Sequence, residues 1–473
     1  MIPTERGCKN TLMNGRWAAF QAVRAVLRGA GFVQETLGRL RGQGLAGREA
    51  GLAMEIALGA VRRLITIEHV LSRAARYDSR RVNSEMRAIL AIGAYQVIWL
   101  DRIPEFAAVD ETVELTRRAL NQRAAGMANA ILRNLTRAIE ARGIEWERLN
   151  SRHVRTDWRR ACLFREPVLP DPNADKHSAA HLAAATGLRR PRYAALVKQY
   201  GAQRAEAVAW AQQAAPVTVI HRNALRIDAG IFQDRIQREL GDEAEWTPDG
   251  VFVPADANVL DTPLFQEGRA YVQDMTARAA ALLLDVRPGE RILDFCAAPG
   301  GKSIVLAECL LDRGEILACD ASPDRIQHLA ENIRRLRLTS VRAHLLQTSD
   351  ASDADLQREF DAALVDVPCS NSGVFARRPE ARLGFTREKL DSLCELQAVL
   401  LRKTASCVRP GGRLVYSTCS IEPDENERIV EAFLHEQPQW RQLLARLTLP
   451  EWGPKPSDWR DGGFAALLVR QEG

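Results

Sequence analysis

The stretch that most constrains this chain is residues 291–303, where an apolar strand leads through a loop of small residues into a helix. A turn of this kind leaves backbone N–H groups free at the helix N-terminus, above the carboxyl end of a parallel strand. Ligands bind at that place in open α/β sheets. The spacing matches neither G-x-G-x-x-G nor G-x-x-x-x-G-K-[ST], because only Ala, Ala and Pro come directly before Gly300. The loop alone therefore predicts a small cofactor, and it supports neither a dinucleotide nor a nucleoside triphosphate.

Length and composition indicate an ordinary globular protein with more than one domain. The 473 residues are enough for two to four domains, each with its own core. No apolar run reaches the length of a membrane span, and residues 1–8 contain no apolar region of an export signal. The nine cysteines include no C-x-x-C pair, which favours reduced thiols over disulfides or a zinc site. We therefore expect a cytoplasmic monomer without a bound metal.

Charge is distributed unevenly along the chain. Residues 1–200 contain 33 Lys and Arg against 19 Asp and Glu, whereas residues 201–473 contain 32 against 41. A basic front and an acidic back predict a polyanion-binding module that is joined to a different kind of domain. A solvated Arg-rich surface is the alternative explanation, and charge alone does not separate the two.

Residues 16–150 show helical periodicity, and no strand pattern interrupts it. The segment 86–100 is apolar nearly all round, so we expect it to be the buried central helix of a bundle. Pro104 ends this helical segment because it pushes Ile103 out of the helical region. Beyond the bundle, three prolines within the six residues 167–172 exclude a helix, and residues 149–190 are interpreted as a linker or insertion.

Four short motifs in this helical part resemble the NusB-type RNA-binding domain. Their order and spacing, more than any one of them, carry the resemblance, which covers most of residues 14–140. Any helical bundle needs similar apolar faces, and this is the alternative reading. The motifs are Gly93-Ala94-Tyr95-Gln96, Arg102-Ile103-Pro104, residues 108–115 (AVDETVEL) and Asn129-Ala130-Ile131-Leu132-Arg133.

Residues 191–262 read as a small αβ unit, with a helix over 191–214, a strand over 217–221, a helix over 231–240 and a strand near 251–253. This unit resembles the RNA-recognition-like subdomain that precedes the catalytic domain in one group of RNA methyltransferases. His221 and Arg222 either face RNA or simply close the end of a strand.

From about residue 263 onward, strands and helices alternate, which predicts βαβ units and a parallel sheet. The expected strands follow the opening one at 291–295, and a last strand near the C-terminus would close the sheet. They are placed at residues 316–320, 341–346, 362–366, 413–419 and 464–469.

Polar groups follow the first four of these strands, namely the glycine loop and then Asp320, Asp350 and Asp366. A carboxylate after the second strand can accept both hydroxyls of a ribose. No phosphate-binding cluster accompanies the loop, so a nucleoside cofactor with an uncharged backbone fits better than NAD. S-adenosylmethionine has this shape; its carboxylate would take N–H groups of the loop, and its amino group would take Asp366. Helix capping is the alternative role for each of these aspartates.

Two cysteines, Cys369 and Cys419, also follow strand ends. A thiolate adds reversibly to an electron-poor ring carbon because it is soft and leaves readily. Cytosine C5 cannot take a methyl group unaided, but a thiolate at C6 makes C5 enamine-like. Two cysteines and one aspartate would supply the nucleophile, the base and the acid. Plain burial is the alternative, because Cys is among the most buried residue types, and we assign Cys309, Cys394 and Cys407 to it.

Three motifs together resemble the RNA 5-methylcytosine methyltransferases, and with the NusB-like front the chain is similar to the bacterial Sun/Fmu (RsmB-type) enzymes. These enzymes modify a cytosine in small-subunit ribosomal RNA. The motifs are residues 294–303 (DFCAAPGGKS), residues 366–374 (DVPCSNSGV) and residues 416–427 (YSTCSIEPDENE), and the whole resemblance covers about residues 14–145 and 190–471.

The resemblance implies a role for each motif residue. Cys419 would be the nucleophile on C6, and Cys369 would assist proton removal and release. Asp366 could also reach the cytosine edge. S-adenosylmethionine would be held by Cys296, Ala297, Ala298, Pro299, Gly300, Gly301, Lys302, Asp320, Asp350 and Asp366.

The sequence departs from the family pattern after the Pro-Cys motif. Residues 377–383 read RRPEARL in place of the usual Arg-His-Pro-Asp-Ile-Lys-Trp, and Asn371-Ser372 replaces the commoner small-residue-Thr. These loops are expected to face RNA. Two alternatives therefore stay open, a transfer-RNA 5-methylcytosine methyltransferase and a non-enzymatic RNA-binding or antitermination factor.

The expected architecture has four parts. They are a NusB-like all-α domain (1–148), a Pro-rich linker (149–190), a small α+β RNA-recognition-like subdomain (191–262) and an α/β Rossmann-like S-adenosylmethionine-dependent methyltransferase domain (263–473).

Overall fold

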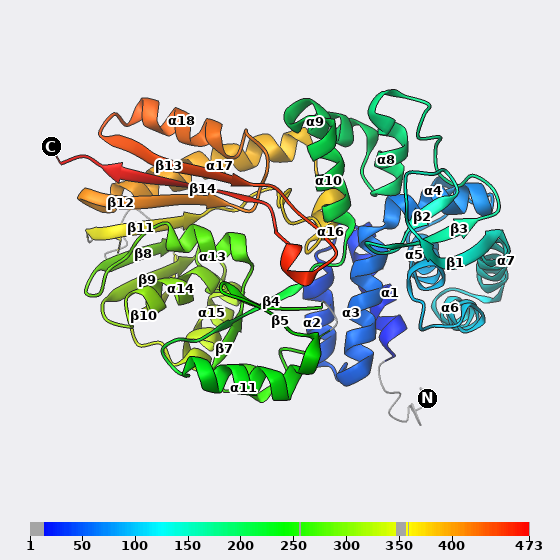
Figure 1. The fold of residues 1–473 in the computed structure, drawn as a ribbon, viewed down its shortest axis with the longest axis horizontal. Coiled ribbons are helices and arrows are strands. Elements are labelled where there is room, and N and C mark those ends of the chain that lie inside the picture. Colours follow the sequence, from blue (N-terminus) through cyan, green and yellow to red (C-terminus); the bar gives the residue numbers. More distant parts are fainter. Residues whose placement is uncertain (1–13, 255–256, 347–355, 358, 473) are drawn as a thin grey trace, which may run out of the picture. The chain divides into compact units, whose positions relative to one another are not determined.

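The computed structural model describes residues 14–254, 257–346, 356–357 and 359–472 (Figure 1). The chain forms two compact units. The first runs to Ala215 and also includes Phe375–Gly384, and the second comprises Pro216–Val374 and Phe385–Gly473. Within the described ranges, no helix has the length and apolar character that crossing a bilayer requires.

The first unit begins with a helical bundle built around α5 (Ser84–Trp99). Nearly every residue of α5 from Met86 to Ile98 is buried, which confirms the prediction of a central helix. Asn83 caps α5 by accepting a hydrogen bond from the Met86 N–H. The surrounding helices are α1 (Gly15–Leu27), α2 (Val33–Gly42), α3 (Gly47–Arg62), α4 (Leu64–Ala74), α6 (Glu105–Ala119) and α7 (Gln122–Ala138).

A three-stranded antiparallel sheet follows the bundle, in the order β1 (Ile139–Glu145), β3 (Arg160–Phe164), β2 (His153–Arg155). The prediction of uninterrupted helix up to residue 150 is therefore wrong over its last part. The pairing of β1 with β3 contains two register irregularities, so the apolar residues of β1 do not alternate regularly and give no strand signal. Three more helices complete the described part of this unit up to Ala215: α8 (Ala179–Ala185), α9 (Arg190–Tyr200) and α10 (Ala202–Gln213).

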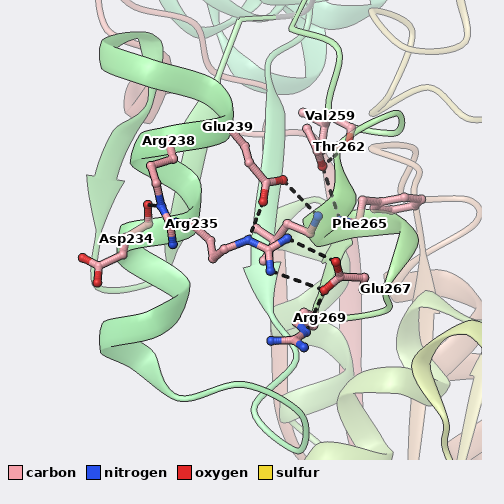
Figure 2. A network of polar contacts seen from close by, with 10 residues as sticks. Asp234, Arg235, Arg238, Glu239, Val259, Thr262, Phe265, Glu267 and Arg269 are labelled. Atoms are coloured by element: carbon pink, nitrogen blue, oxygen red, sulfur yellow. Dashed lines mark hydrogen bonds and ion pairs between the residues drawn. The ribbon is translucent and has the colours of Figure 1, made fainter.

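The second unit begins with a four-stranded antiparallel sheet in the order β5 (Glu245–Thr247), β6 (Gly250–Val253), β4 (Thr218–Arg222), β7 (Ala270–Val272). Helix α11 (Ala229–Leu240) packs on it through Phe232 and Ile236. Figure 2 shows a polar network that fixes α11 to the segment before β7. In it, Glu267 pairs with both Arg235 and Arg269, at 3.3 Å and 2.9 Å.

The larger sheet of this unit has seven strands in the order β10-β9-β8-β11-β12-β14-β13. The first five are parallel, and β14 is antiparallel to both of its neighbours. The predicted strands are all present, whereas β13 was not predicted. The strands are β8 (Arg291–Phe295), β9 (Glu315–Asp320), β10 (Val341–Leu345), β11 (Phe360–Asp366), β12 (Val408–Thr418), β13 (Trp440–Thr448) and β14 (Gly463–Arg470).

Helices cover both faces of this sheet (Figure 1). Alternate strand residues serve the two faces: Ile292 and Leu364 join the core on one side, and Leu293 and Val365 join the core on the other. The first core contains α13 (Met275–Leu282), α14 (Gly301–Cys309) and α15 (Pro323–Leu336), and the second contains α17 (Arg387–Ser406) and α18 (Glu427–Glu436). The predicted fold class is confirmed, and the carboxyl ends of β8, β9, β11 and β12 meet at one edge.

Candidate active site

The loop between β8 and α14 is held in a conformation that few residue types adopt. Gly300 has a φ of 102° at the N-cap of α14, and Cys296 has a φ of 67°. A Cβ at Gly300 would approach Leu329 Cδ1 to 2.5 Å, so the loop also lies tightly on α15. This loop presents the start of α14 at the carboxyl edge of the sheet, as the sequence predicts.

Hydrogen bonds from β9 and α15 anchor the same loop. The Ala297 N–H donates to the Cys319 carbonyl at 2.7 Å. Asn332 Nδ2 donates to the Pro299 carbonyl at 3.1 Å, and Arg325 donates to the Ala298 carbonyl. The loop is therefore fixed by its own backbone geometry and by β9 and α15.

Asp320 lies at the end of β9 and is buried. One carboxylate oxygen accepts a hydrogen bond from the Ser322 N–H at 3.0 Å, and the other lies 3.2 Å from an Arg325 nitrogen. Asp320 thus also stabilises the turn before α15, which is close to the helix-capping role that the sequence analysis gave as its alternative. Asp350 lies outside the described residues. The position of Asp320, one strand along from the glycine loop, fits the ribose side of a nucleoside.

Asp294, inside β8, is a buried carboxyl group that the sequence analysis gave no role. Ser303 Oγ donates to its Oδ2 at 2.6 Å, whereas Oδ1 has no hydrogen-bond partner among the described residues. Burial raises the pKa of Asp294 to about 7. An orphaned oxygen beneath the loop is compatible with a polar ligand group above it.

Lys302 and Asp366 form a close ion pair beside this loop, with Nζ 2.6 Å from Oδ2. Ser417 Oγ donates to the other oxygen of Asp366 at 2.6 Å. Burial opposes the charge of Lys302, but Asp366 outweighs it and the pKa of Lys302 is raised. A thiolate at Cys419 adds to this rise, because its negative charge favours the protonated lysine.

The two predicted cysteines lie together. Cys369 follows β11, Cys419 follows β12, and their Sγ atoms are 3.1 Å apart. The contact with Cys419, together with burial, raises the pKa of the Cys369 thiol well above its usual value. A thiolate at Cys369 is therefore a stronger base than the thiolate of an ordinary cysteine.

Asn371 contacts both cysteines, although the sequence analysis noted it only as a departure from the family pattern. Its Oδ1 accepts from Cys419 Sγ at 3.3 Å, and its Nδ2 donates to the Cys369 carbonyl at 3.0 Å. Its φ of 59° lies in the left-handed region, which Asn adopts more readily than most residues.

Glu425 was also missed as a site residue. Its buried carboxylate accepts hydrogen bonds from Ser370 and Ser420, the residues directly after the two cysteines. The motif at 416–427 contains it, but four acidic residues lie close together there, and the sequence does not say which one points inward.

The remaining cysteines assigned to packing lie on or beside helices. Cys309 is in α14, Cys394 in α17, and Cys407 is the C-cap of α17. Cys394 and Cys407 Sγ each donate to a backbone carbonyl at 3.4 Å. Burial raises the pKa of Cys296, in the glycine loop, to about 12, so its thiol stays protonated.

The loop at 377–383 does not behave as predicted. It belongs to the first unit, where Arg382 is buried and donates to the carbonyls of Arg62, Thr186, Gly187 and Gln212. Burial lowers the pKa of Arg382 to about 9. The expectation that this loop faces RNA is therefore wrong for Arg382 and for the equally buried Glu380, since both pack inside the first unit.

His221 likewise follows the plainer of its two readings. It is buried, its ring stacks on Tyr271, and its Nε2 lies 3.0 Å from the Gln273 carbonyl. Burial lowers the pKa of His221 to about 4, so the ring is neutral. It closes the end of β4 and does not face RNA.

Comparisons with known proteins show which family the chain belongs to. The family model described as 16S rRNA methyltransferase RsmB/F matches residues 281–452, and the NusB family model matches residues 13–137. Ribosomal RNA small subunit methyltransferase B of Vibrio cholerae is 30% identical over 98% of this chain and 99% of its own length. The chain belongs to the RsmB/F methyltransferase family.

Two further relatives extend the comparison. Ribosomal RNA small subunit methyltransferase B of Pseudomonas syringae is 30% identical over 91% of this chain and 89% of its own length. The crystal structure of PH0851 has the same fold, with a TM-score of 0.72, 20% identity, and coverage of 96% of this chain and 98% of that one. The recognised family and the NusB-like front are thus confirmed.

Proposed function

We propose that this RsmB/F-family protein transfers a methyl group from S-adenosylmethionine to C5 of a cytosine in 16S ribosomal RNA, through a covalent adduct between Cys419 and C6. The observation that carries the proposal is the pair of sulfur atoms 3.1 Å apart, at strand ends neighbouring the glycine loop. The names of the full-length relatives support the choice of small-subunit ribosomal RNA.

The residues of the glycine loop fit S-adenosylmethionine, which would supply an electrophilic methyl group. The start of α14 would take the carboxylate of the amino-acid tail, because free N–H groups and the helix dipole favour an anion there. Asp320 would accept the ribose hydroxyls. Lys302 holds Asp366 in place through their ion pair, and Asp366 would take the amino group or the cytosine edge.

The cysteines would divide the chemistry on the base. Cys419 adds to C6 as a thiolate, which makes C5 nucleophilic enough to take the methyl group. The C5 proton must then leave and the Cys419–C6 bond must break, which restores the aromatic ring. Cys369, once it has released its own proton to solvent, would take the C5 proton as a base, because its sulfur lies against that of Cys419. The electrons of the C5–H bond then form the C5=C6 double bond, and Cys419 leaves as a thiolate. Lys302 would stabilise the thiolate electrostatically.

The first unit would bind the RNA through phosphate contacts. The excess of Lys and Arg over Asp and Glu in residues 1–200 motivates this. Binding of the full chain to RNA should then weaken steeply as salt rises, since each neutralised phosphate releases counterions. A flat salt dependence would contradict phosphate binding.

The catalytic test compares Cys419→Ala with Cys394→Ala, a matched thiol loss on α17. Each protein is incubated with methyl-labelled S-adenosylmethionine and either unmodified 16S ribosomal RNA or transfer RNA, and 5-methylcytosine is measured by mass spectrometry. We expect transfer to 16S ribosomal RNA that Cys419→Ala abolishes and Cys394→Ala retains. Undiminished transfer by Cys419→Ala would contradict the nucleophile, and transfer confined to transfer RNA would contradict the substrate.

Calorimetric titration with S-adenosylmethionine separates an enzyme from an RNA-binding factor. The enzyme must bind the cofactor, and Cys419→Ala should bind it as the wild type does. If no binding is seen in a folded protein, the non-enzymatic alternative is favoured.

A further inference from the structure

The loops that carry Cys369 and Cys419 are joined by a single carboxylate. Glu425 Oε1 accepts a hydrogen bond from the Ser370 N–H at 2.8 Å, and Oε2 accepts from Ser370 Oγ and Ser420 Oγ, both at 2.5 Å. Ser370 and Ser420 directly follow the two cysteines. One side chain therefore fixes both neighbours of the thiol pair.

A second set of contacts holds Glu425 itself in place. Tyr416 donates its hydroxyl to the Glu425 carbonyl at 2.6 Å, from within β12. Gln397 Nε2, on α17, donates to Glu425 Oε1 and to the Pro368 carbonyl, both at 2.9 Å. The carboxylate is thus tied to β12 and α17, and Gln397 extends the same network to the residue just before Cys369.

The groups around the Glu425 side chain are all hydrogen-bond donors, so the position requires a carboxylate. Glu425 is fully buried, and among the described residues no Lys or Arg forms an ion pair with it. Its stability inside the protein rests on donors alone, since four hydrogen bonds match the capacity of an ionised carboxyl group. An amide in its place would turn a donor toward donors and lose part of the network.

We propose that Glu425 is a positioning residue that sets the distance and direction between the Cys369 and Cys419 thiols. No described hydrogen bond joins its carboxylate to either sulfur, so it positions them through Ser370 and Ser420. Its negative charge also helps to raise the pKa of Cys369. The inference rests on the proposed function for its catalytic consequence, whereas the geometric claim stands without any substrate.

A purely structural role would predict a different result from a positioning role. Loss of general stability would lower the amount of folded protein and leave kcat per folded molecule unchanged. Loss of positioning would lower kcat while the affinity for S-adenosylmethionine stays the same, because the described hydrogen bonds of the Glu425 carboxylate go to Ser370, Ser420 and Gln397 and none goes to the glycine loop.

The test uses the full chain with Glu425→Gln and measures two quantities. The first is kcat for methyl transfer, with KM for S-adenosylmethionine; we expect kcat to fall about 10- to 100-fold, as for a small misplacement of reacting groups, with KM unchanged. The second needs neither RNA nor cofactor. Diamide takes up the two thiol hydrogens as it oxidises Cys369 and Cys419 to a disulfide, and peptide mapping follows the rate, which we expect to be several-fold slower than in the wild type.

Glu436→Gln is the matched control, because Glu436 lies on α18 in an exposed ion pair with Arg402. It should leave both quantities unchanged. If Glu425→Gln does not fold, Ser420→Ala removes a single arm of the network and should give a smaller change in the same direction. Wild-type kcat together with a wild-type rate of disulfide formation would overturn the proposal. A slower disulfide in a protein that never methylates RNA would instead retain the positioning role and refute the proposed function.

Discussion

The glycine loop after β8 and the two thiol loops after β11 and β12 reach the same edge of one sheet by different means. The glycine loop is fixed by its own backbone, with Gly300 at a φ of 102° and anchors from adjacent elements. The two thiol loops are held to each other by side chains, above all Glu425, which joins Ser420, 5 residues away, to Ser370, 55 residues away. The first region is therefore a local motif, and the second is a tertiary arrangement.

This difference makes the two regions separable by mutation. A defect in the glycine loop should affect binding of S-adenosylmethionine and leave the thiol pair intact. A defect in the thiol loops should do the reverse. The following variants test that separation.

The largest effect on methyl transfer is expected from Gly373→Ala. A Cβ at Gly373 would lie 2.6 Å from the Gly462 backbone and 2.9 Å from the Cys419 carbonyl, and neither backbone can yield without moving the thiol loop. We expect a loss of about 1–3 kcal/mol in the free energy of unfolding and a loss of methyl transfer of about 100-fold. Calorimetry should show unchanged cofactor affinity in the folded protein. A tenfold lower affinity for S-adenosylmethionine, together with normal methyl transfer at saturating cofactor, would contradict the separation of the two regions.

The reciprocal variant is Gly300→Ala. Its φ is unfavourable for alanine, and the added methyl group would press on Leu329. We expect about tenfold weaker binding of S-adenosylmethionine, corresponding to about 1.4 kcal/mol, while diamide oxidation of the Cys369–Cys419 pair keeps its wild-type rate. Gly126→Ala is the control, because a Cβ there meets no atom within 4 Å and its φ is not positive.

Asp294, beneath the glycine loop, makes the stability of the protein depend on pH. Its pKa is about 7 in the folded protein against 3.8 for an ordinary aspartate, so between these values the folded state holds a proton that the unfolded state releases. The contribution of Asp294 to the free energy of unfolding is therefore fully present below about pH 4. This contribution, on the order of 4 kcal/mol, is lost as the pH rises toward 7. Asp294→Asn should remove this component, which denaturant unfolding at pH 5 and pH 8 would detect. An identical pH dependence in wild type and variant would contradict the raised pKa.

The smallest effect is expected from Asn371→Ala. The variant removes the acceptor of the Cys419 thiol, and a single hydrogen bond contributes about 1 kcal/mol, or roughly fivefold in rate. Single-turnover methyl transfer is the measurement. Asn258→Ala, which removes a hydrogen bond from the exposed Asn258 side chain to Asp261, serves as the control. No difference between the two variants would show that Asn371 does not act on the nucleophile.

The same contrast explains what the sequence could reveal. The strands that end at Asp320, Asp366 and Cys419 follow from local patterning, and the glycine loop from residue type and spacing. The approach of Cys369 to Cys419 followed from parallel strand order, since both follow strand ends at one edge. The contact itself, and the roles of Glu425 and Asn371, depend on which way short polar side chains point across two loops, which no periodicity encodes.

Two other misses have physical reasons of the same kind. The β1–β3 sheet was hidden because its pairing is irregular and its apolar residues are few. Arg382 was expected to face RNA as part of the loop at 377–383, but it is buried where four backbone carbonyls receive its guanidinium group. In both cases the partner lies far away in sequence.

The central claim is that Cys419 is the nucleophile and Cys369 assists its release, and a trapped intermediate tests it most directly. Cys369→Ala is incubated with S-adenosylmethionine and 16S ribosomal RNA, and the protein that stays linked to RNA under denaturing conditions is digested and mapped by mass spectrometry. We predict a covalent complex in which a 5-methylcytidine adduct lies on Cys419, and none in the Cys369→Ala/Cys419→Ala double variant. A complex attached to another residue, or a Cys369→Ala protein that releases methylated RNA at the wild-type rate, would contradict the account.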